Sequence, residues 1–123
     1  MKRVVIESPF MGKGDSDTER AANEAENLRY LRACMADCFA RGEAPFASHG
    51  LYTQPGVLRD DVPTERDLGI RAGFVWRDVA DMTVIYTDRG FSYGMRLGES
   101  DANRKNRPIE FRTVPGWTAR GDA

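Results

Sequence analysis

"MTVIYT", residues 82 to 87, is the clearest β-strand signal in the sequence. Most of its side chains are β-branched or aromatic, which pleated sheets favour. A second run, "RVVIES" at residues 3 to 8, is almost continuously apolar, as expected of a strand covered on both faces. Strands of this kind are typical of parallel sheets flanked by helices, so the two stretches favour an α/β fold.

Helical patterns separate the strand signals along the chain. Ser16 followed by Glu19 has the spacing of a capping box, and Pro63 suits the first turn of a later helix. This later helix has an apolar stripe at Leu68, Ala72, Val75, Trp76 and Val79. We predict helices near 17–41, 63–80 and 92–105, and strands near 3–8, 44–48, 82–87 and 108–112.

The alternation of strands and helices predicts one α/β domain built on an open parallel sheet. Right-handed crossovers and a count of four strands favour the order 2-1-3-4, with helices on both faces. We assign residues 1–114 to this domain and expect residues 115–123 to be a loose C-terminal tail. Ligands of such sheets bind beyond the carboxyl ends of the strands, where the strand order reverses.

Charge and composition argue against several classes of partner. The 123 residues include 18 basic and 19 acidic side chains, so we expect neither nucleic acid nor a membrane as partner. No apolar run approaches the ~20 residues of a membrane span, and the first residues lack the apolar core of a signal peptide. These features favour a cytoplasmic location. Cys34 and Cys38 lie on one helix face, which favours core thiols over a disulfide or metal pair.

His49, the only histidine, follows the second predicted strand in a loop of about fifteen residues. Loops of this length in compact domains are often functional. The imidazole could contact a phosphate, a ribose hydroxyl or a base edge, or it could only stabilise the loop. Tyr52 in the same loop could stack on a ligand or fill the core. No second His or Cys lies at metal-ligand spacing from His49, so we predict neither a metal nor a cofactor.

The loops after the first and third strands contain further candidate ligand contacts. Ser8 and Phe10 precede a helix N-terminus, and Phe10 could stack on a base or close the pocket. Asp88 could accept hydrogen bonds from ribose hydroxyls, and Ser92 and Gly94 offer backbone N–H groups at the start of the next helix. The alternative at these positions is a plain turn, with Asp88 acting only as a cap.

Several segments together resemble a known group of proteins. They are "ESPF" (7–10), "GEAPFASHGLYTQPG" (42–56), "PTERDLGIRAGFVW" (63–76), "ADMTVIYTD" (80–88) and "SYGM" (92–95). Over roughly residues 3–112 the sequence resembles a family of small uncharacterised proteins of bacteriophages and their bacterial hosts. That family in turn resembles a trimmed nucleoside 2-deoxyribosyltransferase. The resemblance implies the matching fold, a nucleotide-derived ligand and, for a phage protein, the host cytoplasm as location.

The resemblance also implies positions for a catalytic group. In the transferases a glutamate on the last helix attacks the anomeric carbon, and the motif places this nucleophile on Gly98. Glu99 is one position later, about 100° around a helix, and Asp101 is three residues beyond Gly98. Glu99 and Asp101 are therefore catalytic candidates only if the protein is an enzyme. Ser92, Gly94 and Met95 match the small-residue turn at the start of that helix.

A second carboxylate is implied near the nucleobase. Glu65 lies in the matching segment, although its place at a helix start is also explained by the positive end of the helix dipole. Gly69 and Gly73 follow in the same helix and make a smooth surface, against which another helix of the chain or a neighbouring subunit could pack. We take a subunit contact as the sharper hypothesis, and so expect a homodimer or larger homo-oligomer.

Two functions remain open at this point. The first is a binding protein for a nucleotide-derived small molecule, in which a phage protein would capture a host nucleotide signal. The alternative is an N-glycosidase or deoxyribosyltransferase that cleaves the glycosidic bond of a nucleotide. The missing nucleophile at Gly98 favours the binding protein.

Overall fold

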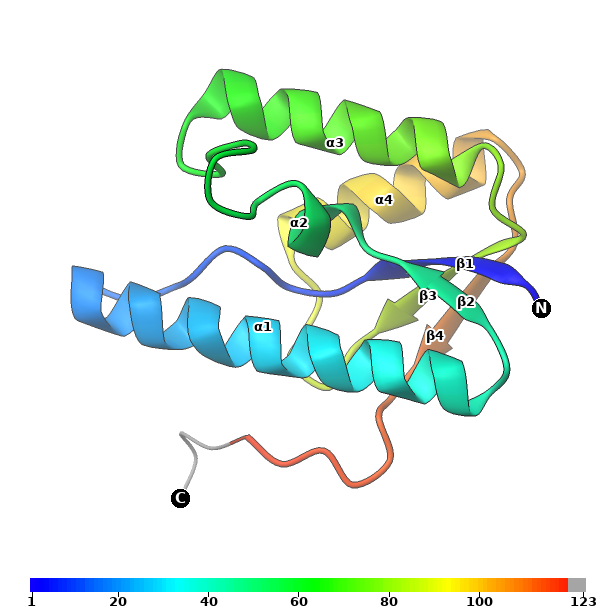
Figure 1. Ribbon diagram of the computed structural model, residues 1–123, viewed down its shortest axis with the longest axis horizontal. Helices are drawn as coiled ribbons and strands as arrows, with labels where there is room; N and C mark the ends of the chain where they lie inside the picture. Colours follow the sequence, from blue (N-terminus) through cyan, green and yellow to red (C-terminus); the bar gives the residue numbers. More distant parts are fainter. Residues whose placement is uncertain (120–123) are drawn as a thin grey trace.

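The computed structural model describes residues 1–119 and contains a four-stranded parallel sheet in the order β2-β1-β3-β4 (Figure 1). The strands are β1 (Arg3–Glu7), β2 (Ala44–Phe46), β3 (Met82–Tyr86) and β4 (Ile109–Arg112). The central pair, β1 and β3, aligns Val5 with Thr83 and Ile6 with Val84. The predicted α/β class, parallel sheet and strand order are confirmed.

Helices cover both faces of the sheet. The four helices in residues 1–119 are α1 (Asp17–Ala40), α2 (Ser48–Leu51), α3 (Pro63–Arg77) and α4 (Tyr93–Arg104). Figure 1 shows α1 on one face and α3 with α4 on the other, as right-handed crossovers require when the strand order reverses between β1 and β3. The short α2 was not predicted. It shortens β2 to Ala44–Phe46 and divides the expected long loop.

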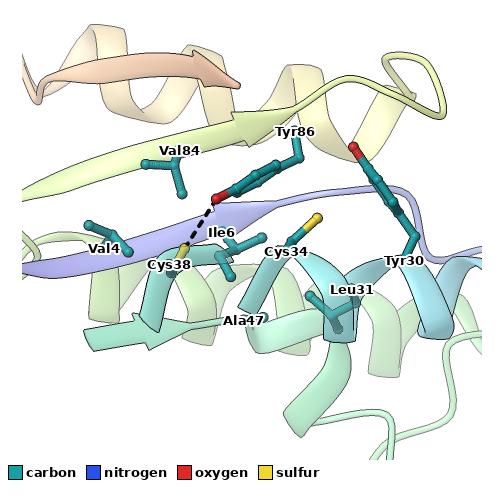
Figure 2. Close-up of a cluster of buried hydrophobic side chains, with 9 residues drawn as sticks. All are labelled: Val4, Ile6, Tyr30, Leu31, Cys34, Cys38, Ala47, Val84 and Tyr86. Carbon is teal, nitrogen blue, oxygen red and sulfur yellow. Dashed lines mark hydrogen bonds between the residues drawn. The ribbon is translucent and has the colours of Figure 1, made fainter. Parts of the chain in front are cut away.

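The face of the sheet under α1 is an apolar core (Figure 2). Alternate strand residues point to this face because successive strand side chains lie on opposite sides. Those from β1 and β3 meet side chains of α1 in a cluster that includes Val4, Ile6, Val84, Tyr86, Tyr30, Leu31, Cys34 and Cys38. Both cysteines are free and buried, and burial raises the pKa of each thiol. The prediction of core thiols is confirmed.

The opposite face of the sheet is built around a buried arginine. Arg77, the last residue of α3, is 2% exposed. Its Nε donates to Thr83 Oγ1 over 3.0 Å, its Nη1 donates to Asp101 Oδ2 over 3.3 Å, and its Nη2 donates to Glu7. The guanidinium therefore links α3 to β1, β3 and α4. A charged group can be buried at low cost only when it has hydrogen-bonding and ion-pair partners of this kind.

The apolar stripe of α3 faces outward, contrary to what an amphipathic pattern usually indicates. Val75 is 66% exposed and Trp76 is 52% exposed, and Leu68 and Val79 are exposed as well. The buried positions of this helix are Gly73 and Arg77. The physical reason is that α3 packs on the domain through Gly73 and the ion pairs of Arg77. The apolar stripe therefore lies on the solvent side of the helix.

Gly69 and Gly73 of α3 contact other parts of the same chain. A Cβ at Gly73 would lie 2.6 Å from Ser48 Oγ on α2, and one at Gly69 would lie 3.3 Å from Leu58 Cδ1. The expected close contact at these glycines is therefore present. The contacting groups come from α2 and from the loop that follows it. The subunit contact that we expected at this surface is thus not needed to explain the two glycines.

The segment after β4 packs against α1 instead of forming a loose tail. The ring of Trp117 lies 4.8 Å from that of Tyr30, and the guanidinium of Arg29 lies 4.0 Å above Trp117. Arg29 Nη2 also donates to the carbonyl of Thr118 over 2.6 Å. Residues 120–123 of the predicted tail lie outside the described residues. Among residues 1–119, no helix is long and apolar enough to cross a membrane.

Candidate functional site

A cleft of about 360 Å³ opens at the carboxyl ends of β1 and β3, where the strand order reverses. This is the position at which open α/β sheets bind ligands. Its walls come from the loops after β1 and β3, from α2 and α3, and from the start of α4. Six of the predicted ligand contacts line it: Ser8, Phe10, His49, Ser92, Gly94 and Met95.

Ser8 and His49 form a polar pair in this cleft. Ser8 Oγ and His49 Nε2 share a hydrogen bond of 2.8 Å, which joins the end of β1 to α2. Burial lowers the pKa of His49 to about 4, so the imidazole is neutral at physiological pH. The ring of Phe10 meets the imidazole edge-on at 6.4 Å. A neutral imidazole beside a hydroxyl can exchange hydrogen bonds with uncharged polar groups of a ligand.

The start of α4 forms another wall of the cleft. Ser92 Oγ accepts a hydrogen bond from the Met95 N–H over 3.3 Å, so the side chain of Ser92 caps the helix. Met95 is buried, and its Sδ accepts from the Ser92 N–H over 3.3 Å. A Cβ at Gly94 would meet nothing within 4 Å, which leaves the backbone open there. The first N–H groups of a helix lack intrahelical partners and favour anions.

Asn27 of α1 connects the two loops that flank the cleft, and the sequence analysis missed it. Asn27 is only 3% exposed, and its Oδ1 accepts a hydrogen bond from Arg89 Nε over 2.9 Å. Its Nδ2 donates to the carbonyls of Phe10 and Met11 over 3.2 and 3.4 Å. A single buried amide thus positions both the loop after β1 and an arginine of the loop after β3.

The charged side chains of the cleft are more often basic than acidic. Lys13, Arg66, Arg77 and Arg89 line it, together with the acidic Glu7 and Asp60. Arg77 is fully engaged in the buried network, and Arg66 Nε lies 3.8 Å from Asp60 Oδ1. Within residues 1–119, Arg89 uses only its Nε in a hydrogen bond, so its two terminal nitrogens are available to a ligand.

Three predicted ligand contacts lie outside this cleft. Asp88 Oδ2 accepts from Tyr30 Oη over 2.6 Å and from the Val114 N–H over 2.8 Å, so it anchors the segment after β4. Tyr52 and Glu65 line a smaller adjoining pocket of about 60 Å³, which shares His49 with the cleft. Glu65 Oε1 accepts from the Arg59 N–H over 3.1 Å. The expectation that Asp88 shares a cleft with His49 is therefore wrong.

The two catalytic candidates also lie outside the cleft lining. Asp101 is 1% exposed, and its carboxylate accepts hydrogen bonds from Arg77, Arg104 and Lys105. Glu99 follows Gly98 on α4 and is absent from the cleft lining. The carboxyl that does line the cleft nearest the sheet is Glu7 at the end of β1, which the sequence analysis did not select.

These features define a single α/β domain with a ligand-sized cleft at the reversal of its parallel sheet. Residues 2–112 match the model of a family described as a domain of unknown function (DUF7768), and the chain belongs to this family. Searches of curated proteins and of solved structures found no match. In the described part of the chain, no group of three or more His, Cys, Asp and Glu side chains could hold a metal ion.

Proposed function

We propose that this protein binds a nucleotide-derived small molecule in the cleft. The observation that carries the proposal is Arg89, whose guanidinium is held by the buried Asn27 with two nitrogens left over, in a cleft that also includes the start of α4. Holding the half-buried Arg89 side chain in place costs side-chain entropy, which a bound anion would offset, and a helix start favours anions as well. Together they suit a phosphate group.

The remainder of the cleft suits a nucleoside. The rings of Phe10, Phe74 and Phe91 are part of the lining, and aromatic faces stack on bases of any sequence. Ser8 and the neutral His49 can hydrogen-bond uncharged sugar or base atoms. A cleft of about 360 Å³ is within the size range of small-molecule sites.

The binding role is favoured over glycosidic cleavage because neither predicted nucleophile, Glu99 or Asp101, lines the cleft, and the carboxyl that does, Glu7, is ion-paired with Arg77. A covalent nucleophile must lie within contact distance of the carbon that it attacks. The capture of a host signal by a phage protein, which the resemblance implies, remains a prediction.

Arg89→Ala is expected to weaken nucleotide binding by about tenfold or more, since it removes charge-assisted hydrogen bonds to the phosphate. Calorimetry with AMP, GMP, CMP and UMP, and with the four unphosphorylated nucleosides, measures this loss. The nucleosides should bind wild type and variant alike, because they lack the group that Arg89 contacts.

Arg32→Ala is the matched control, because Arg32 lies exposed on α1 and away from the cleft. It should bind every nucleotide as wild type does. Release of free base is followed by chromatography in the same samples, and intact nucleotide after prolonged incubation supports the binding role. Failure of all four nucleotides to bind, or an unchanged affinity in Arg89→Ala, would contradict the proposal.

We also propose that the exposed stripe of α3 forms a homodimer contact. Val75→Glu should then shift the wild-type dimer to monomer in light scattering at micromolar concentration, because it places a charge in an apolar interface. Val75 is 66% exposed, so its replacement should leave the melting temperature of the separated monomer almost unchanged. A wild-type protein that is monomeric under these conditions contradicts the homodimer.

A further inference from the structure

Glu7 lies at the meeting point of the sheet, the cleft and the helices α3 and α4. It ends β1, and its side chain points to the α3 and α4 face because the alternate residues Val4 and Ile6 point to the α1 core. The side chain is 16% exposed, and Glu7 lines the cleft. The carboxyl is therefore mostly enclosed by protein but open on its cleft side.

Only one oxygen of this carboxyl is engaged within residues 1–119. Arg77 Nη2 donates to Glu7 Oε2, while the other nitrogens of Arg77 donate to Thr83 and Asp101. Glu7 Oε1 has no hydrogen bond from any side chain or backbone group in this part of the chain. Among residues 1–119, Glu7 Oε1 is not one of the fully buried polar atoms that lack a partner, so it is open to a hydrogen-bond donor that enters the cleft.

The chain also leaves space for the carboxyl at Gly98. A Cβ at Gly98 of α4 would lie 2.4 Å from Glu7 Cδ, closer than two non-bonded carbon atoms can approach. Glycine inside a helix costs about 1 kcal/mol relative to alanine, and here it allows the Glu7 carboxyl to lie against the helix. The position of the Glu7 carboxyl is thus determined both by Arg77 of α3 and by Gly98 of α4.

Burial raises the pKa of Glu7 to about 7, against the opposing effect of Arg77. The charged groups facing Glu7 are Arg77 from α3 and Asp101 from α4, and the charge of Asp101 raises the same pKa. Arg104 and Lys105 lie beyond them and hold Asp101. Glu7 therefore changes its protonation close to neutral pH.

We propose that Glu7 Oε1 accepts a hydrogen bond from a ribose hydroxyl of the ligand and so selects ribonucleotides over forms that lack the sugar hydroxyls. This inference rests on the proposed function, because it assigns the sugar-recognising group of the same cleft. The Glu7 carboxylate repels phosphate and accepts hydrogen bonds from hydroxyl groups, whereas the guanidinium of Arg89 attracts phosphate. The two side chains therefore orient a ligand that has a phosphate at one end and free hydroxyls at its centre.

The test compares the best-binding of AMP, GMP, CMP and UMP with its 2′,3′-dideoxy form. At pH 8 wild type should bind the ribose form about tenfold or more tightly, as expected of a hydrogen bond to a charged group. From pH 8 to pH 6 this preference should fall about fivefold, to about twofold, because Glu7 takes up a proton near pH 7. The phosphate titrates equally in both ligands, so the affinity ratio isolates the sugar contact.

Two variants separate Glu7 from a general effect on the cleft. Glu7→Gln keeps the shape and an acceptor for Arg77, and it should reduce the preference to below about threefold at every pH. Gly98→Ala keeps the charge but displaces the carboxyl, and it should also reduce the preference. Asp67→Asn, an exposed carboxyl on α3, is the control and should retain the wild-type ratio.

Equal binding of the ribose and dideoxy forms by wild type would overturn the inference while leaving the proposed function intact. The same holds for a preference that survives in Glu7→Gln, which would assign sugar recognition to another group or to the base. If none of the four nucleotides binds, the proposed function itself fails, and the inference fails with it.

Discussion

Arg77→Met is expected to lower the free energy of unfolding by about 3–5 kcal/mol, the loss typical of removing one partner from a buried ion pair. Met has a similar length and fills the space, so the main loss is the three hydrogen bonds to Thr83, Asp101 and Glu7. Urea denaturation at pH 8, followed by circular dichroism, measures the change.

The loss should depend on pH in a direction that Glu7 determines. Arg77 lowers the pKa of Glu7, so its removal raises that pKa further above the unfolded value of 4.5. The folded variant then retains a proton that the unfolded chain releases, and its stability falls as pH rises above about 5. The difference between wild type and variant should therefore be larger at pH 8 than at pH 5.

The double variant Arg77→Met with Glu7→Gln is the matched control. It removes the carboxyl that the arginine would leave unpaired, so it should recover part of the stability at pH 8 and lose the added pH dependence. A single variant within about 1 kcal/mol of wild type would show that the buried network contributes little.

The sheet could be predicted because its signals are local. The runs at 3–8 and 82–87 are apolar over a strand's length, and such runs specify central parallel strands almost without regard to tertiary context. The strand order was predicted from right-handed crossovers together with the count of four strands. The short α2 has no comparable signal, since four residues cannot show a helical period.

The packing of α3 could not be read from its periodicity. An apolar stripe predicts a buried face only when nothing else competes for the core, and here Arg77 and Gly73 are on the buried side. The partners of Arg77 are 6, 24 and 70 residues away along the chain, so no local pattern indicates them. The stripe stays largely at the surface, where Trp76 contacts the ring of Phe46 at 5.4 Å between centroids.

The candidate site was predicted in its position but only partly in its residues. Loops after parallel strands meet at one edge, which placed Ser8, His49 and Ser92 correctly in one cleft. Glu7 was missed because it lies inside the predicted strand 3–8, and only the structure ends β1 there. Asn27 was missed although a signal existed: it shares a helix face with Leu31, Cys34 and Cys38, and a polar side chain on an apolar face requires buried partners.

Asp88 shows the opposite error. Its place at the tip of the strongest strand indicated a ligand contact, but its Oδ2 accepts from Tyr30 and from the Val114 N–H, and Asp88 is absent from the cleft lining. Tyr30 lies 58 residues away in the sequence, so only the fold brings it to this position. A side chain at a strand end can either contact a ligand or hold a neighbouring segment in place. The sequence alone does not distinguish these two roles.

Gly73→Leu is expected to lower the free energy of unfolding by about 2–3 kcal/mol, near the upper end for overpacking a close contact. Even a Cβ at this position would lie 2.6 Å from Ser48 Oγ and 3.0 Å from Ser48 Cβ, so α2 must move away from α3. This movement carries His49 with it and should abolish nucleotide binding, because His49 and Ser48 both line the cleft. Denaturation and calorimetry measure the two losses, and Arg71→Leu, exposed on the same helix, should show neither. A variant that keeps its stability and binding but loses its dimer in light scattering would instead assign Gly73 to a subunit contact.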